Sequence, residues 1–98
     1  MLTSKQRAFL RSLANPIDSI FQIGKGGING QLIKQVDETL TAREIIKIKV
    51  LETSPVKAKE ACAELSEKTS SQPVQVIGSK FVIYRENKKL EERIKLPK

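Results

Sequence analysis

The stretch FQIGKGGING, residues 21–30, constrains the fold of this chain more than any other segment. It holds four of the chain's five glycines within seven positions, together with Lys25. The glycines follow an apolar segment typical of a strand, residues 16–23, and precede a helical pattern that starts near Asn29. A turn from strand to helix needs one or two glycines. Four of them predict a loop that brings bare backbone close to another molecule.

Periodic apolar patterns along the rest of the chain predict the element order αβαβαββ, in the α/β (α+β) class. Thr3 with Gln6 is typical of a capping box at the start of the first helix. Ser54 followed by Pro55 predicts the start of the third helix. Gly78 and Ser79 are expected to join the last two strands tightly. The expected helices are 2–14, 29–40 and 54–69, and the expected strands are 16–23, 44–51, 73–78 and 80–85.

Length and charge narrow the class of partner. At 98 residues the chain is long enough for about one domain, and its formal net charge is +7. The basic excess lies toward the two ends of the sequence. No long amphipathic basic helix is present, so the charge indicates a nucleic acid in preference to a membrane.

Several classes of site are disfavoured by what the sequence lacks. It has no histidine, which excludes a histidine base or a histidine metal site. The single Cys62 lies on the same face of the third helix as Ala61 and Leu65, so we interpret it as a small core residue. The first 14 residues are too charged for a signal peptide, and no stretch reaches the length of a membrane span. We therefore expect a cytoplasmic protein with no cofactor, metal or membrane partner.

The position of the glycines predicts phosphate binding. A loop that follows a strand and precedes a helix exposes backbone N–H groups beside the positive end of the helix dipole. A dinucleotide fingerprint fails because Asn29 occupies its last glycine position, and a P-loop fails because Gly26 follows Lys25 where Ser or Thr is needed. The pattern that remains is G-x-x-G at Gly24–Gly27, which clamps the RNA backbone in KH domains. A KH loop joins two helices, so only this chemistry carries over.

Four segments together resemble one known family. LTSKQRAFLRSLA, FQIGKGGI, REIIKIKVL and VQVIGSKFVIYR, in this order and followed by IKLPK, are similar to the CRM domain, an RNA-binding module named for chloroplast RNA splicing and ribosome maturation. The length resembles that of its stand-alone bacterial form, the YhbY-like proteins. Two positions depart from the family pattern: Gly26 stands where Asn is frequent, and Arg43 stands where His is frequent. The first departure removes an amide that could read a base.

The resemblance implies a fold and a function. The implied fold is a single αβαβαββ domain with a mixed four-stranded sheet, related to the C-terminal domain of translation initiation factor three. The resemblance also implies that the loop Gly24–Gly27 contacts RNA, and that the bacterial proteins associate with precursors of the large ribosomal subunit. We divide the chain into a CRM-like domain, residues 1–85, and a basic tail or short helix, residues 86–98.

We predict a monomeric, non-enzymatic RNA-binding protein that acts on ribosomal RNA or pre-ribosomal particles in large (50S) subunit assembly. Few aromatic side chains are available for stacking on bases, which favours recognition of RNA shape and phosphate. Phe9 and Phe81 are expected in the core, and Tyr84 is left open. The predicted RNA-binding residues are Gly24, Lys25, Gly26, Gly27, Lys5, Arg7, Arg11, Lys34, Lys47 and Lys49.

Two other classes of function remain as alternatives. An enzyme acting on a small phosphate compound would need a general acid or base beside the loop, and Asp37 and Glu38 are the nearest carboxylates downstream. A protein-binding adaptor on ribosomal particles would use exposed apolar residues, for which Ile45 and Leu51 of the second strand are candidates.

Overall fold

The computed structural model describes residues 2–91 and 93–97. The elements follow one another in the order αβαβαββ, which confirms the predicted succession. They are α1 (Ser4–Ala14), β1 (Phe21–Ile23), α2 (Gly30–Arg43), β2 (Ile45–Val50), α3 (Ala58–Thr69), β3 (Gln72–Ile77) and β4 (Lys80–Tyr84).

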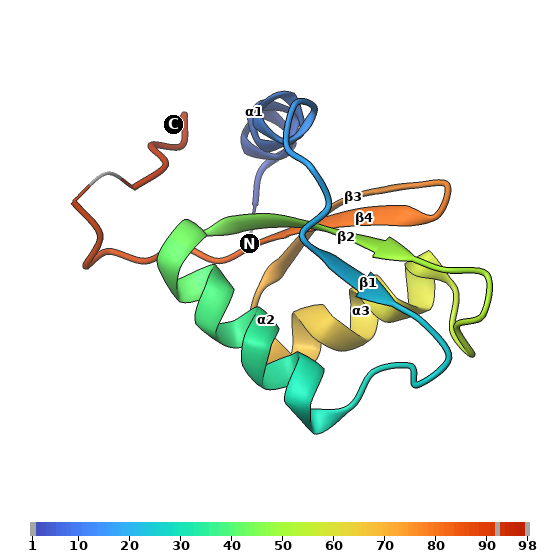
Figure 1. Ribbon diagram of the computed structural model, residues 1–98. Coiled ribbons are helices and arrows are strands. Elements are labelled where there is room, and N and C mark those ends of the chain that lie inside the picture. The colour runs from blue at the N-terminus through green and yellow to red at the C-terminus, as the bar shows by residue number, and fades with distance from the viewer. Residues whose placement is uncertain (1, 92, 98) are drawn as a thin grey trace.

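The strands form one mixed four-stranded sheet, as expected, and their order in it is β1-β2-β4-β3. β1 runs parallel to β2, whereas β4 is antiparallel to both β2 and β3. Figure 1 shows α1 on one face of the sheet and α2 with α3 on the opposite face, so the domain has three layers. The order of strands makes β1 an edge strand. The glycine-rich loop that follows β1 therefore lies at an open edge of the sheet.

Each face of the sheet carries a hydrophobic core. Ile46, Ile48 and Phe81 belong to the core beneath α2 and α3, and each is at most 1% exposed. Leu10 of α1 packs with a second set on the other face, which includes Ile45 and Val82. Alternate side chains of β2 thus enter opposite cores near its start. Cys62 is buried in the first core as predicted, and this burial raises the pKa of its thiol.

The first two helices begin where their capping residues predict. The Thr3 hydroxyl accepts from the Gln6 amide at 3.1 Å, and the Gln6 side chain accepts from the Thr3 amide at 3.0 Å, which completes a capping box. Asn29 is the N-cap of α2, and its side-chain oxygen accepts from the Leu32 amide at 2.8 Å. Both caps act within three residues, so sequence alone locates them.

The predicted start of α3 is wrong. The helix begins at Ala58, after the N-cap Lys57, and not at Ser54 and Pro55. The Ser54 hydroxyl instead donates to the Val56 carbonyl at 2.7 Å and accepts from the Val56 amide at 3.1 Å. A serine side chain that satisfies nearby backbone groups in this way stabilises a local turn in competition with a helix.

The first strand is shorter than the predicted segment 16–23. The Ile17 amide donates to the Ala14 carbonyl at 3.0 Å, so the chain completes a turn after α1 before it extends. Regular pairing starts at Phe21, although the Ile20 amide already donates to the Lys47 carbonyl at 3.1 Å. The segment before Phe21 thus connects α1 to the sheet.

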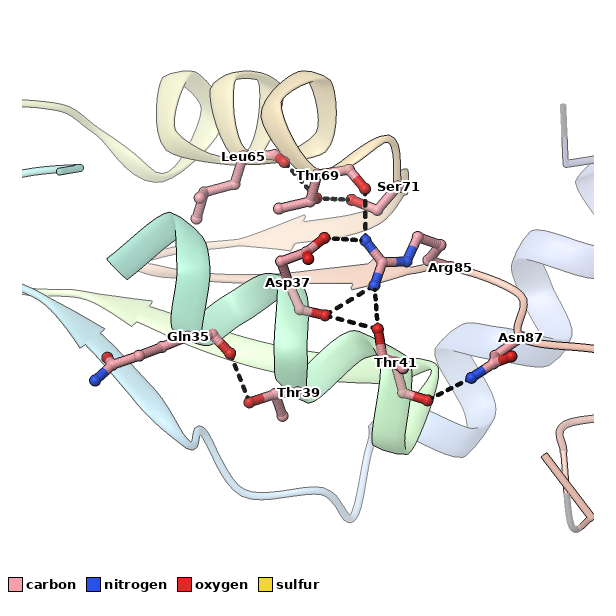
Figure 2. A network of polar contacts seen from close by, with 9 residues as sticks. All are labelled: Gln35, Asp37, Thr39, Thr41, Leu65, Thr69, Ser71, Arg85 and Asn87. Atoms are coloured by element: carbon pink, nitrogen blue, oxygen red, sulfur yellow. Dashed lines mark hydrogen bonds and ion pairs between the residues drawn. The ribbon is translucent and has the colours of Figure 1, made fainter. Parts of the chain in front are cut away.

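Arg85, directly after β4, fastens α2 to α3 (Figure 2). Its Nη1 donates to the Thr69 carbonyl at 2.8 Å and also to the Asp37 carboxylate. Its Nη2 donates to the Asp37 carbonyl and to the Thr41 hydroxyl, both at 2.8 Å. A planar guanidinium with several donors suits such a cluster of oxygens. The arrangement ties the middle of α2 to the end of α3.

A buried carboxylate holds the C-terminal tail against the domain. Glu44, which follows α2, is 1% exposed. Its Oε2 accepts from the Asn87 amide at 2.8 Å, and its Oε1 accepts from the Ile94 amide at 2.6 Å. Ile94 and Leu96 pack on the core beneath α1. The described part of the tail contains turns and no helix.

Candidate nucleic-acid interface

The glycine loop, Gly24–Gly27, forms a tight turn between β1 and α2. The Gly27 amide donates to the Gly24 carbonyl at 2.9 Å, which closes a four-residue β-turn. Lys25 and Gly26 are the two central residues of this turn, and both are exposed. The motif G-x-x-G therefore places one cation and one bare backbone unit at the tip.

Only one residue of the glycine loop needs to be glycine for the turn itself. Gly27 has φ +63°, and a Cβ on it would lie 2.9 Å from Pro55 Cγ. Gly26 does not have a positive φ, and the nearest atom to a Cβ there is Asn29 Nδ2 at 3.9 Å. The conformation and packing of the chain thus explain Gly27 and leave Gly26 unexplained. Its missing side chain leaves backbone open to an approaching ligand.

A hollow of about 350 Å³ lies beside the turn, and we call it the loop hollow. Its walls come from the edge strand β1, the glycine loop and the first turns of α2. Amides and glycine backbone dominate the lining, and no charged side chain contributes to it. The lining residues are Gln22, Gly24, Gly26, Gly27, Asn29, Gln31, Leu32 and Gln35. Neutral donors next to a helix N-terminus suit the oxygens of a sugar-phosphate backbone.

Sequence reasoning missed the three glutamines of this hollow. Gln31 and Gln35 are four residues apart and so lie on one face of α2. Gln22 alternates with the buried Ile23, which places it on the other side of β1. The spacing of the helical pair is a signal that could have indicated a polar wall. Nothing local indicates that Gln22 lies beside it.

The predicted basic residues are distributed over three parts of the molecule. Lys25 is exposed at the tip of the glycine loop, and Lys34 is exposed on α2, but neither lines the loop hollow. Lys5 and Arg11 are exposed on α1, and Arg7 is half-buried with its Nε donating to the Pro73 carbonyl at 3.4 Å. Lys47 and Lys49 belong to β2 and are half-buried. The structure places Lys25 at the tip of the glycine loop, and none of the seven predicted basic residues lines the loop hollow.

The aromatic residues offer no open stacking platform. Phe81 is 1% exposed, as expected of a core residue, and Tyr84 is 3% exposed. Burial, aided by the negative charges of Glu44 and Glu86, raises the pKa of the Tyr84 phenol to about 12. Phe9 and Phe21 are half-buried. All four aromatic side chains are thus at least partly covered, which favours contacts to phosphate and sugar over base stacking.

The contacts and burial of three residues, Asp37, Ile45 and Leu51, weaken the alternative classes of function. The Asp37 carboxylate pairs with Arg85 (Figure 2), so it is not free to act as a base beside the loop. Ile45, which the adaptor alternative needs exposed, is 7% exposed because α1 covers that end of β2. This expectation was wrong. Leu51 is half-buried, and its Cδ1 would lie 3.5 Å from a Cβ added to Gly24.

Among residues 2–91 and 93–97, no group of three or more Cys, Asp and Glu side chains is placed to hold a metal ion. Over those residues, no helix has the length and apolar character required to cross a bilayer.

Residues 2–85 match the family model of the CRS1 / YhbY (CRM) domain. The chain belongs to the CRM-domain family. The match spans all seven elements and the glycine loop, and it confirms the resemblance seen in the sequence. Residues 86–98 lie outside the matched range.

Two relatives and one solved structure are similar to this chain over nearly its whole length. The chain is 45% identical over 97 residues to "Probable RNA-binding protein YqeI" of Bacillus subtilis, covering 99% of this chain and 100% of that protein. It is 28% identical to a Haemophilus influenzae protein named "RNA-binding protein", with 99% and 96% covered. The solution structure of the hypothetical protein SAV1595 from Staphylococcus aureus superposes with a TM-score of 0.81 at 59% identity, covering 99% and 100% of the two chains.

Proposed function

We propose that this chain binds RNA through the glycine loop and the loop hollow, and that its target is ribosomal RNA of the large-subunit precursor. We further propose that it acts as a cytoplasmic monomer and that it catalyses no reaction. Lys25 would contact a phosphate directly, and Lys5, Arg7, Arg11, Lys34, Lys47 and Lys49 would extend the basic surface around it.

Gly26 is the observation that supports RNA binding most directly. Neither a positive φ nor a close neighbour requires a glycine there, yet its bare backbone faces the loop hollow beside Lys25. A surface of amides and open backbone with one lysine at its tip suits a sugar-phosphate chain better than a compact organic ligand. Family membership and the names of the relatives favour the same class of partner.

The ribosomal part of the proposal is tested inside cells. Protein would be crosslinked to RNA by ultraviolet light, and the attached fragments would be sequenced. We expect the fragments to map to the large-subunit ribosomal RNA and its precursor. Fragments spread over messenger RNAs in proportion to their abundance would contradict this target, whereas association with particles that survives nuclease and high salt would favour the adaptor.

Salt should weaken RNA binding steeply. If about five phosphates are neutralised on single-stranded RNA, the logarithm of affinity falls with a slope near −3.5 against the logarithm of salt concentration. Raising salt from about 50 to 200 mM would then weaken binding roughly 100-fold. Fluorescence titration of an oligouridine of about 20 nucleotides measures the slope. A slope near zero would contradict a basic RNA-binding surface.

Lys25→Ala should weaken RNA binding and leave the fold intact. Lys25 is exposed, so its removal should change the free energy of unfolding by less than about 0.5 kcal/mol. The loss of a charge-assisted phosphate contact should weaken binding by about 1 kcal/mol or somewhat more. Lys59→Ala is the matched control, because Lys59 is also exposed and belongs to α3, on the far side of the sheet from α1. Equal affinities for both variants would show that the loop tip is not a contact.

A further inference from the structure

The helix α1 covers only part of its face of the sheet. Ile45, Val82 and Tyr84 on this face belong to the core beneath α1. In the strand register, Ile45 pairs with Tyr84 and Lys47 pairs with Val82. Because alternate side chains of a strand share a face, Lys47 and Lys49 of β2 and Lys80 of β4 lie on the α1 side. Lys47 lies beside the core residue Val82, and its Nζ donates to the Asn15 carbonyl at 3.5 Å, whereas Lys49 and Lys80 lie beyond the core. We call these three lysines the lysine face.

The lysine face brings like charges together without a compensating carboxylate. Lys49 lies directly opposite Lys80 in the antiparallel pair of β2 and β4. Like charges in that position destabilise a sheet. The ion pairs formed by the described residues are Arg85–Asp37 and Arg93–Glu86, and neither involves the lysine face. An unfavourable cluster of this kind becomes favourable when an anion binds to it.

The shape of the surface argues against a small-molecule ligand. A shallow hollow of about 110 Å³ lies at the lysine face, lined by Asn15, Lys47, Gln75, Ile77, Lys80, Phe81 and Val82. Pockets for organic ligands occupy about 300 to 1,000 Å³, so this one is too small to enclose such a compound. A phosphate group on an extended polymer needs no enclosure, because it can rest on an open surface.

The lysine face continues into the loop hollow across the edge strand. Gln22 lines the loop hollow, and in the parallel pairing of β1 with β2 it lies beside Lys49. The distance from β1 across β2 to β4 is two strand spacings, or about 10 Å. Gln22, Lys49 and Lys80 therefore form a short track that leads from the loop hollow onto the sheet.

We propose that the lysine face is a second phosphate-binding surface for the RNA strand held at the glycine loop, centred on the cross-strand pair Lys49 and Lys80. The proposal rests on the RNA-binding function proposed above and extends its site from the loop to the sheet. The RNA strand leaves the loop hollow at Gln22 and crosses β2 and β4, where the ammonium groups of Lys49 and Lys80 contact successive phosphates. Such contacts position RNA without reading its bases.

The test compares charge-removing and charge-keeping variants of the pair. Binding of an oligouridine of about 20 nucleotides is titrated over a range of salt concentrations. For Lys49→Gln with Lys80→Gln, the loss of two contacts should make the salt slope shallower by about 1.4 and weaken binding about 20-fold at 0.1 M salt. Lys49→Arg with Lys80→Arg should keep the parent's slope. Lys59→Gln with Lys68→Gln on α3 is the matched control and should have a smaller effect.

Folding of the charge-removing variant is checked by its melting temperature, which should equal or exceed the parent's because a repulsive pair is removed. If Lys49→Gln with Lys80→Gln binds within twofold of the parent's affinity and with an unchanged salt slope, the lysine face does not bind phosphate. The loop site would stand in that case, provided that Lys25→Ala still weakens binding. Equal losses in the α3 control would also overturn the lysine face, since they would indicate a general charge effect. If the parent itself fails to bind RNA, both the proposed function and this extension are wrong.

Discussion

Gly27→Val is expected to destabilise the domain by about 3 kcal/mol. Gly27 has φ +63°, a conformation that costs a residue with a side chain about 1 to 2 kcal/mol, and more when the side chain is β-branched. Its Cβ would also lie 2.9 Å from Pro55 Cγ, and such overpacking costs about 1 to 3 kcal/mol. Urea denaturation followed by circular dichroism measures the loss. RNA affinity should fall as well, because the turn that presents Lys25 is distorted.

Two further variants separate the cost of the positive φ at Gly27 from the cost of the clash with Pro55. Gly26→Ala is the matched control, because its Cβ meets nothing closer than Asn29 Nδ2 at 3.9 Å, and its stability should stay within about 0.5 kcal/mol of the parent's. Gly27→Ala should cost less stability in a Pro55→Ala protein, measured against Pro55→Ala, than in the parent, because the clashing Cγ of Pro55 is absent. A Gly27→Val protein as stable as the parent would contradict the described turn. Weaker RNA binding by the stable Gly26→Ala protein would support the loop as a contact.

Glu44→Gln is expected to destabilise the domain by about 2 kcal/mol and to release the tail. Both carboxylate oxygens of the buried Glu44 accept from backbone amides, those of Asn87 and Ile94. Glutamine offers one acceptor oxygen, and its NH₂ group would face the second amide donor. An unsatisfied buried donor costs about 1 to 3 kcal/mol. Denaturant titration measures the stability, and limited trypsin digestion after Lys88, Lys89 and Arg93 measures the accessibility of the tail.

The control for this second experiment is Glu86→Gln. Glu86 is an exposed carboxylate in an ion pair with Arg93, and surface pairs contribute about 0 to 1 kcal/mol. Its replacement should therefore change stability little. Unchanged stability and unchanged digestion of Glu44→Gln would mean that Glu44 does not hold the tail.

Local signals predicted much of this fold because they act over a few residues. The predicted capping box at Thr3 and the predicted helix start near Asn29 are confirmed in the structure, as is the tight connection at Gly78, whose φ is +56°. The predicted start of α3 was wrong because a local signal can be ambiguous. The Ser54 hydroxyl can either cap a helix or stabilise a turn, and the sequence pattern does not distinguish the two.

The sequence by itself determined the order of the elements, the position of the glycine loop between β1 and α2, and membership of the CRM family. It could not show that the turn requires glycine at Gly27 and not at Gly26, because a side chain at Gly27 would clash with Pro55, which reaches the loop only in the folded chain. It showed that β2 has two faces, but only the packing of α1 decided that Ile45 is buried while Lys47 and Lys49 stay partly open. The pairing of Lys49 with Lys80 was likewise decided by strand register, which depends on contacts between segments distant in the sequence.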